Sequence, residues 1–330
     1  GIPRGLCKNY LIFHSLSPRG VTFAPCIYIY KHMRTLLISW LLLLGTVCIS
    51  AAQQEAISYK IYDVKQQREV TLREITAAVP AGTVLVFGEQ HDDSIAHALQ
   101  YQLLQLLQQE WGSKKVLLSM EMFQKDVQYI VDEYLQGLIS EKNFIKEARA
   151  WGNYADYRPM VEYAKHHGIS VLAANTPSRY TNMVTTRGLG SLELLSKEAR
   201  KTYLPPLPVD TLKGNYYDRF LEAMGGHSIP GFNLYQSQNV WDATMAHSIY
   251  NKSGKYRNGI IYHLCGRFHS DYGEGTVFRL RREYDLDVVV ISSFYQADVQ
   301  QTDWADWKQL GDYVIVTRAA ETAAAGAGKN

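Results

Sequence analysis

Residues 83–91 read TVLVFGEQH, and residues 259–269 read GIIYHLCGRFH. In each stretch an apolar run, rich in Val, Ile, Leu and aromatic residues, predicts a buried β-strand. Each run leads to a glycine, Gly88 or Gly266, and a histidine follows three residues later, at His91 or His269. Because glycine lets a chain turn sharply, each stretch predicts a strand whose end presents an imidazole.

Further apolar runs alternate with amphipathic segments along the chain. After the first GxxH stretch, Ile95, Leu99 and Leu103 recur at helical spacing and predict a helix that covers the sheet. The other runs that predict strands are residues 115–120, 169–173, 288–291 and 313–316. Strands that alternate with helices favour an α/β fold, with a mostly parallel central sheet flanked by helices.

Residues 178–256 break this alternation. They are polar, contain the proline-rich stretch LPPLP at 204–208, and predict a helical insertion that caps the sheet. We therefore predict one α/β domain over residues 53–318 that carries this insertion. The tail, residues 319–330, is rich in Ala and Gly and is predicted to be disordered.

The start of the chain is typical of an exported protein. A basic residue precedes the apolar run Leu36–Leu44, and small residues end at Ala52, which is the pattern of a cleaved signal peptide. Met33 stands directly before this run, so we interpret residues 1–32 as upstream sequence. The predicted location is therefore exported, either periplasmic or associated with the outer membrane.

Cys48 introduces an alternative for the same segment. Acylation of this thiol after cleavage would anchor the protein to a membrane as a lipoprotein. The preceding residues, Gly45–Val47, are a poor match to the usual approach to an acylated cysteine. We therefore favour cleavage after Ala52 over a lipid anchor.

Charge and cysteine content limit the possible partners. The 330-residue chain has 34 Lys and Arg and 32 Asp and Glu, but residues 1–52 hold five of the basic residues and none of the acidic ones, which leaves 29 basic against 32 acidic. No clustered basic face of the kind that binds nucleic acid is indicated, so nucleic acid is not a predicted partner. Cys265 is the only cysteine after residue 52, so the predicted mature chain cannot form an internal disulfide.

Four charged or titratable residues follow or end the predicted strands. They are Glu89 and His91 in the first GxxH stretch, Glu121 after the run 115–120, and His269 in the second stretch. In open α/β sheets the carboxyl ends of the strands form the usual ligand site. Two imidazoles and two carboxylates at that edge would suit a metal or a proton-transfer centre. The alternative is that the glutamates are helix caps or surface acids and the histidines are hydrogen-bonded surface residues.

Three residues outside these stretches are candidates for contacts to a cofactor. Gln238 and Asp242 stand one helical turn apart, so both can point to the same place. Arg179, after the strand at 169–173, could grip a carboxylate or phosphate in a bidentate manner. The alternative interpretation places Gln238 and Asp242 on a solvated helix face.

A set of short motifs occurs in order along the chain. The motifs are Phe87–Asp92 (FGEQHD), Glu121–Phe123 (EMF), Asn175-x-Pro177, Gln238-x-x-Trp241-Asp242-x-x-Met245-Ala246 and Gly266-x-x-His269. Together they resemble the ChaN-type haem-binding uptake family, within a wider group that includes the Tiki metalloproteases and erythromycin-esterase-like hydrolases. The resemblance covers about residues 80–295.

This resemblance implies an exported bacterial protein that binds haem, or a small iron compound, in iron uptake. It implies a homodimer that places two haems face to face, and outer-membrane uptake components as possible partners. A tyrosine is the expected iron ligand, since a tyrosinate can bind haem iron axially. No motif identifies which of the 23 tyrosines has this role.

The Tiki-like relatives imply an alternative function, a metal-dependent hydrolase. They require two GxxH motifs and a glutamate around a divalent metal, and Glu89, His91, Glu121 and His269 match that set. A metal held there would lower the pKa of its bound water towards neutrality. One of the glutamates would then be the general base.

Overall fold

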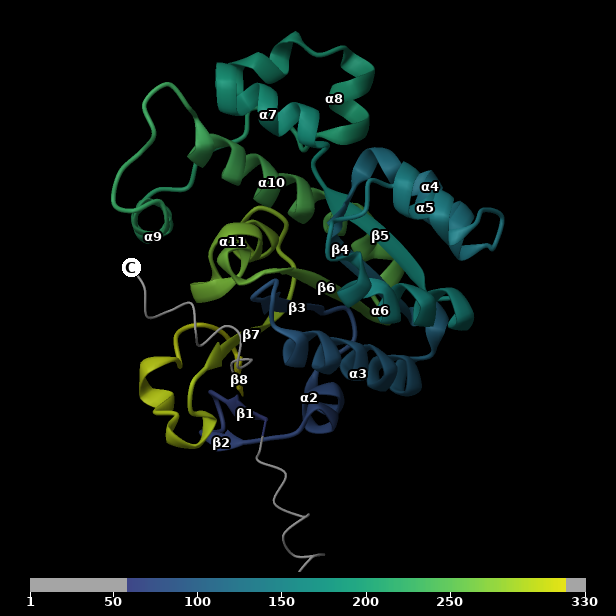
Figure 1. Ribbon diagram of the computed structural model, residues 1–330, viewed down its shortest axis with the longest axis vertical. Coiled ribbons are helices and arrows are strands. Elements are labelled where there is room, and N and C mark those ends of the chain that lie inside the picture. Colours follow the sequence, from purple (N-terminus) through teal and green to yellow (C-terminus); the bar gives the residue numbers. More distant parts are fainter. Residues whose placement is uncertain (1–57, 319–330) are drawn as a thin grey trace, which may run out of the picture. The chain divides into compact units, whose positions relative to one another are not determined.

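Six parallel strands form most of the central sheet, and two antiparallel strands extend it at one side. The computed structural model describes residues 58–318 (Figure 1). The strands are β1 (Tyr59–Asp63), β2 (Arg68–Glu69), β3 (Val84–Glu89), β4 (Val116–Gln124), β5 (Ser170–Asn175), β6 (Ile260–Gly266), β7 (Val288–Gln296) and β8 (Tyr313–Arg318). Their order in the sheet is β2-β1-β8-β7-β3-β6-β4-β5, with β1 antiparallel to both of its neighbours. The predicted α/β fold with a mostly parallel sheet is confirmed.

Several predictions concern residues outside the described range. The signal peptide, the upstream residues before Met33, the lipid anchor at Cys48 and the tail at 319–330 all lie there. Within residues 58–318, no helix combines the length and the apolar character that a membrane span requires.

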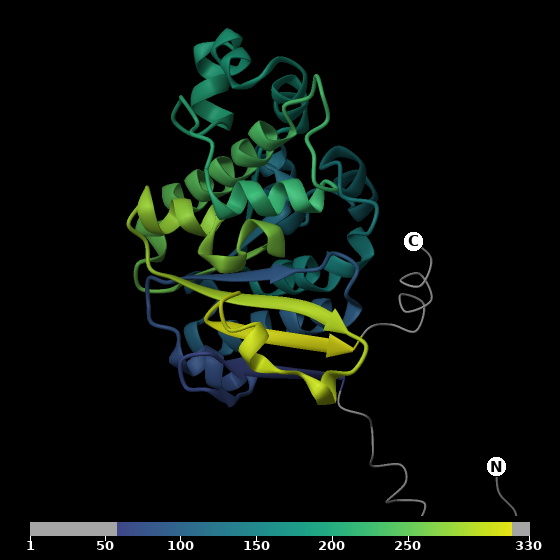
Figure 2. The ribbon, with the colours of Figure 1, turned by 90° about the vertical axis from the view of Figure 1, so that its left-hand side faces the viewer.

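Helices cover both faces of the sheet, as the edge-on view shows (Figure 2). They are α2 (Leu72–Ala78), α3 (Ser94–Trp111), α4 (Gln128–Leu135), α5 (Glu141–Glu147), α6 (Tyr154–His167), α7 (Ser178–Arg187), α8 (Lys197–Tyr203), α9 (Asn215–Ala223), α10 (Leu234–Ser253) and α11 (Gly275–Arg282). Strand β3 shows why two faces need covering. Leu85 and Phe87 pack with α2, α3 and α6, whereas Val84 and Val86 point the other way and pack with α10 and α11. This alternation follows from the two-residue period of a strand.

The insertion lies differently from the cap that we expected over the strand ends. Its last helix, α10, is buried over most of its middle, from Ser237 to Ile249, and packs against one face of the sheet. Helices α7 and α8 pack on the outer side of α10 through a separate apolar cluster that includes Val184, Leu192 and Val240 (Figure 1). Only the first half of α10 therefore reaches the carboxyl ends of the strands, because the helix runs antiparallel to β6, the strand that follows it.

The chain order places a switch point of the sheet topology at the carboxyl ends of β3 and β6. These two strands are neighbours and parallel. The helix after β3 is α3, on one face, and the helix after β6 is α11, on the other face. Where the connections of neighbouring strands leave in opposite directions, the strand ends remain open to a ligand.

The free edge of the sheet, strand β5, is closed by one side chain. The amide of Gln128 donates to the Val171 carbonyl at 2.9 Å and accepts from the Ala173 N–H at 2.8 Å. Gln128 thus occupies the positions that a further strand would fill. Unpaired edges are sites of aggregation, and covering them is a common protection.

Replacing Gln128 by Ala should lower the free energy of unfolding by about 1–3 kcal/mol, because two backbone groups at the edge lose their partner. It should also increase aggregation, since the edge of β5 opens. Urea denaturation and light scattering measure the two effects. Gln102→Ala, on the exposed side of α3, is the matched control and should change stability by less than about 0.5 kcal/mol. Equal losses in the two variants would contradict the role of Gln128.

Candidate functional site

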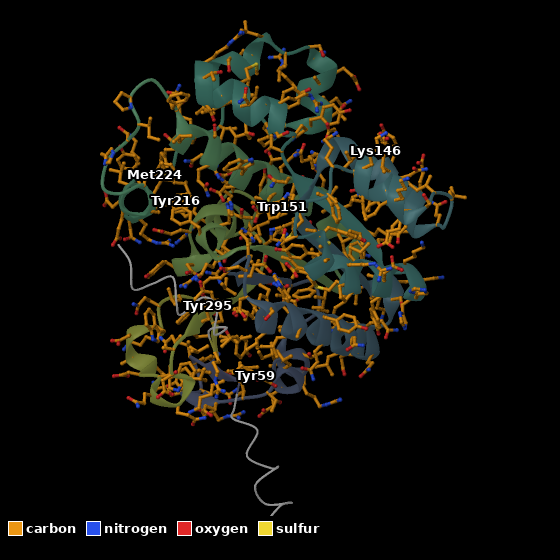
Figure 3. The ribbon with its side chains drawn as sticks, in the orientation of Figure 1. Tyr59, Lys146, Trp151, Tyr216, Met224 and Tyr295 are labelled. Atoms are coloured by element: carbon orange, nitrogen blue, oxygen red, sulfur yellow. The ribbon has the colours of Figure 1, made fainter. Side chains whose placement is uncertain are left out.

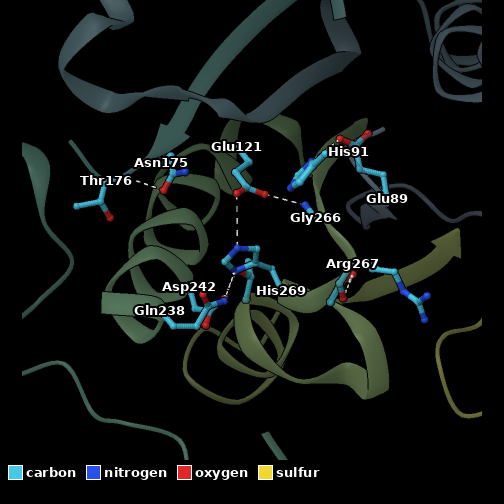
Figure 4. A network of polar contacts seen from close by, with 12 residues as sticks. Glu89, His91, Glu121, Asn175, Thr176, Gln238, Asp242, Gly266, Arg267 and His269 are labelled. Carbon is cyan, nitrogen blue, oxygen red and sulfur yellow. Dashed lines mark hydrogen bonds and ion pairs between the residues drawn. The ribbon is translucent and has the colours of Figure 1, made fainter. Parts of the chain in front are cut away.

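The strand order brings the predicted site residues to one edge of the sheet. Strand β6 lies between β3 and β4. Glu89 ends β3, Glu121 lies on β4, and His269 ends the short 3-10 turn Arg267–His269 that follows β6. Figure 4 shows Glu89, His91, Glu121 and His269 side by side at these strand ends. The two GxxH stretches therefore share one site, although Gly88 and Gly266 are 178 positions apart in the sequence (266 − 88).

Glu121 lies inside its strand and not after it. We expected the strand to end at Met120, but β4 continues to Gln124. Its pairing with β5 shifts between Met120 and Gln124, which is the signature of a bulge or similar irregularity. Bulges re-aim side chains and are common beside functional sites. Glu121 is thereby fixed by strand backbone, which holds it more firmly than a loop would.

His269 stands between two buried carboxylates. Its Nδ1 lies 2.7 Å from Asp242 Oδ1, and its Nε2 lies 3.5 Å from Glu121 Oε1. The other oxygen of Glu121 accepts a hydrogen bond of 2.7 Å from the Gly266 N–H. Glu121 and His269 are each 7 % exposed, and Asp242 is fully buried. The three residues form an acid–imidazole–acid chain that we call the central triad.

The carboxylates keep His269 protonated. Burial by itself lowers the pKa of the imidazole, but the negative charges of Glu121 and Asp242 outweigh burial and raise this pKa to about 10. Burial raises the pKa of Glu121, but His269, His91 and the Gly266 N–H outweigh burial and lower this pKa to about 2. At neutral pH the site therefore holds an imidazolium next to an ionised Glu121.

Asp242 accepts hydrogen bonds from two further side chains. Tyr216 donates to its Oδ2 at 2.6 Å, and Thr276 donates to its Oδ1 at 3.1 Å. The amide nitrogen of Gln238 donates to the Tyr216 oxygen at 3.0 Å and lies 3.1 Å from His269 Nδ1. Burial, and then the charge of Asp242, raise the pKa of Tyr216 well above its usual value, so this phenol stays neutral. Gln238 and Asp242 thus reach the site from α10 and orient His269.

A second acid–imidazole pair lies beside the central triad. His91 Nδ1 is 2.8 Å from Glu89 Oε1, and Tyr157 donates to the same oxygen at 2.5 Å. Gln100 donates to the other oxygen of Glu89, and His97 Nε2 lies 3.5 Å from it. Burial raises the pKa of Glu89, but the hydrogen bonds from His91, His97 and Tyr157 outweigh it, so the net pKa is lowered.

Sequence reasoning missed His97, Gln100 and Tyr157. His97 and Gln100 stand three apart on the buried side of α3, among residues that are otherwise apolar. Two polar side chains at core positions of an amphipathic helix are a signal of a buried polar partner, since burial without one is costly. Tyr157 carries no comparable signal, because it is one of many tyrosines in its segment.

His91 is the part of the site that solvent reaches. Its side chain is 43 % exposed, and its ring meets the edge of Trp151 with the ring centroids 5.2 Å apart. A Cβ on Gly266 would lie only 2.7 Å from His91 Nε2. A side chain at Gly266 would therefore displace the His91 ring from its present position.

The structure does not bring Arg179 to this site. Its guanidinium pairs with Asp126 and packs over the ring of Tyr180. Within residues 58–318 no hydrogen bond or ion pair joins it to Glu121, His269 or another member of the site. Its prediction as a cofactor contact has no support from this geometry, because Asp126 already satisfies its charge.

The four residues predicted to hold a metal are paired with one another. In the described part of the chain, no group of three or more His, Cys, Asp and Glu side chains is arranged to hold a metal ion. Glu89 faces His91, and Glu121 faces His269. A protein-bound metal requires deprotonated ligands, so His269 would have to lose its proton first. The metal assignment stays a prediction, and it needs these side chains to rearrange.

The imidazole of His269 should remain protonated at pH 8 in an NMR titration, because Glu121 and Asp242 raise its pKa to about 10. Because this pKa is raised in the folded state, the protonated imidazole adds to the free energy of unfolding. The contribution is complete below about pH 6.5 and is lost as the pH rises through about 10. Each pKa unit corresponds to at most about 1.4 kcal/mol.

The matched control uses His166, which lies exposed on α6. Urea denaturation between pH 6.5 and 10 gives the second readout, in which His166→Gln should follow the unchanged protein and His269→Gln should lose the alkaline dependence. A neutral His269 ring at pH 7 would contradict the proposed charge state of the triad.

Two solved structures resemble this fold. The first is described as cofacial haem binding to ChaN of Campylobacter jejuni; it covers 81 % of this chain and 99 % of its own, with 17 % identity and a TM-score of 0.58. At that identity the similarity concerns the fold. The second, the type III effector HopBA1, is 12 % identical over 74 % of this chain and 92 % of its own, and its TM-score of 0.40 is too low to support an argument. No curated protein matches the sequence.

The sequence also matches a family profile over residues 75–280, a range that contains the whole site, including Glu89, Glu121 and His269. The profile describes haem-binding uptake proteins of ChaN type in the Tiki superfamily. The expected resemblance is confirmed, and it spans more than half of the 330 residues. The chain belongs to the ChaN family of haem-binding uptake domains, within the Tiki superfamily.

Proposed function

We propose that this protein binds haem, or a related iron compound, and acts after export in iron uptake. The observation that carries the proposal is the family match over residues 75–280. The signal-peptide pattern before residue 53 supports export to the periplasm or the outer membrane. The description of the family supports haem as the ligand. The cofacial haems of the similar ChaN structure support a homodimer that binds two haems face to face.

A hollow between α9 and α10, with a lining of mixed polar and apolar residues, is the best candidate for the haem site. Its volume is about 240 Å³, and Tyr217, Phe220, Met224 and Phe232 are among its lining residues. Figure 3 labels Met224 near the end of α9, close to Tyr216. The lining combines a flat aromatic and aliphatic wall with side chains that can bind iron, which is the chemistry that a haem requires.

Tyr217 is the tyrosine best placed to bind the iron. Tyr216 is excluded, because it is buried and donates to Asp242. Tyr235 lines the same hollow, but its hydroxyl donates to the Leu212 carbonyl. The hydroxyl of Tyr217 makes no hydrogen bond to another described residue, and the side chain is 39 % exposed. A bound haem would supply an iron that this oxygen can coordinate.

The size of the hollow supports a second copy of the chain. Ligand pockets usually measure about 300–1,000 Å³, so a hollow of about 240 Å³ would leave part of a haem uncovered. Ile229 and Phe232 at its rim are 42 % and 52 % exposed. These apolar side chains could cover the other face of a haem in a homodimer.

Titration of the mature protein with hemin should give saturable binding at micromolar protein and a Soret shift. Tyr217→Phe should weaken binding by at least about tenfold, which is 1.4 kcal/mol, because it removes the proposed iron ligand. Absorbance measures the affinity, and the Soret position reports the loss of tyrosinate ligation.

The matched control is Tyr129→Phe on α4, whose side chain is 63 % exposed and lies outside the hollow. It should bind hemin like the unchanged protein. Absence of a Soret shift in the unchanged protein would overturn haem binding itself. A Soret shift that persists in Tyr217→Phe would overturn only the choice of Tyr217 as the iron ligand.

A hydrolase is the second candidate, and the central triad is the observation that favours it. Buried, strongly perturbed acid–imidazole groups in a crevice are typical of catalytic sites. The His269 imidazolium can donate a proton or stabilise a negative charge, whereas Glu89 and Glu121 are ionised. His91, the exposed member, could exchange protons with a substrate or with water. A divalent metal would have to displace the proton of His269, so its binding should strengthen as the pH rises.

On this second candidate, activity on a panel of peptide and ester substrates should appear with added Mn, Co or Zn and increase from pH 6 to 9. Replacing both His91 and His269 by Ala should abolish it, by at least about 100-fold. The same double variant should keep hemin binding through Tyr217, which separates the two functions. A protein that is metal-free and inactive on every substrate would contradict the hydrolase, and haem binding would be the one candidate function left.

A further inference from the structure

A second hollow lies on the outer side of the insertion, between α8 and α10. It has a volume of about 380 Å³, within the common range of about 300–1,000 Å³ for ligand pockets. Figure 1 shows α8 stacked beyond α10, on the side away from the sheet. None of its lining residues forms a hydrogen bond or ion pair with the central triad, in the part of the chain that the structure describes.

One side of this hollow carries only positive or neutral polar groups. Lys197, Arg200 and Lys201 come from α8, and His247 comes from α10. Arg200 pairs with Glu193, but Lys197 and Lys201 have no acidic partner within residues 58–318. No Asp or Glu lines the hollow. The two lysines stand four residues apart, so they project from the same face of α8.

A further lysine, Lys125, adds positive charge near His247. Burial, and then the neighbouring Lys252, lower the pKa of Lys125 to about 8. Burial, and then Lys125, lower the pKa of His247. These shifts show that Lys125 lies near both His247 and Lys252. An anion beside His247 would relieve this repulsion between like charges.

The rest of the lining of this hollow is apolar. It is formed by Leu204 and the segment Pro205–Leu207, and Leu204 is almost fully buried. His247 Nδ1 lies 3.2 Å from the Tyr284 hydroxyl, and the second ring nitrogen has no hydrogen-bond partner among the described residues. The hollow therefore combines cationic side chains with proline-rich apolar residues. The former could bind the charged group of an amphiphilic ligand and the latter its apolar part.

We propose that the hollow between α8 and α10 binds a small amphiphilic anion, with its carboxylate, sulfate or phosphate at Lys197 and Lys201 and its apolar body against Leu204–Leu207. The site is separate from the haem hollow and from the central triad. The ligand is a free molecule, because the hollow has room for a short apolar body and one charged group.

Isothermal titration of the full domain with octyl phosphate tests the proposal. We expect saturable binding, with octanol and inorganic phosphate each at least about tenfold weaker, because each lacks one half of the ligand. The double variant Lys197→Ala/Lys201→Ala should lose at least about tenfold in affinity. Binding should also weaken between 50 and 300 mM salt, since the contact is electrostatic.

The matched control is Lys142→Ala/Lys146→Ala, two exposed lysines four apart on α5, which should bind octyl phosphate like the unchanged protein. A second variant, Leu207→Ser, should weaken octyl phosphate but leave the weak binding of inorganic phosphate unchanged. Equal affinity for octanol would overturn the anion site. Equal losses in the two lysine pairs, or binding only to anionic lipid vesicles and not to free octyl phosphate, would also overturn it.

Discussion

The placement of a protonated imidazole between two buried carboxylates is the constraint on which the rest of this structure depends. Glu121, His269 and Asp242 come from three different elements, β4, the turn after β6, and α10. Removing any one of them would leave a buried charge without its partner, which is far costlier than losing a surface ion pair. The position of β6 between β3 and β4, and the approach of α10 to the strand ends, are therefore both required by the same three side chains.

The paired glycines are the second requirement of this arrangement. A Cβ on Gly88 would collide with Ser270 in the turn after β6, and a Cβ on Gly266 would collide with His91 in the loop after β3. Gly88 thus has no room for a side chain because the backbone of the other loop, at Arg267, lies against it, and a side chain at Gly266 would displace the His91 ring. The repeated GxxH pattern is a consequence of two neighbouring parallel strands whose following loops touch, and both histidines enter the same site through that contact.

Much of this could be predicted from the sequence, because strands and motifs leave local patterns. The runs at 83–87 and 259–264 are apolar and bounded by glycine, and they are central strands. Strand order leaves no such pattern, so the adjacency of β3 and β6 could only be inferred from the repeat. Tyr157, one partner of Glu89, was missed for the same reason, because it contacts Glu89 across 68 residues of sequence. Arg179 was assigned to the site on chemistry alone, and its neighbour Asp126 satisfies that chemistry elsewhere.

Helix α9 connects the two candidate functions. Tyr216 points inward and donates to Asp242, whereas the next residue, Tyr217, lines the hollow between α9 and α10. Because consecutive helical residues point about 100° apart, one short helix can serve two sites at once. A ligand in the hollow that shifted α9 would move the Tyr216 hydroxyl, and with it one of the hydrogen bonds that fix Asp242 beside His269. If the hollow is the haem site, the two candidate functions would meet at the hydrogen bond from Tyr216 to Asp242.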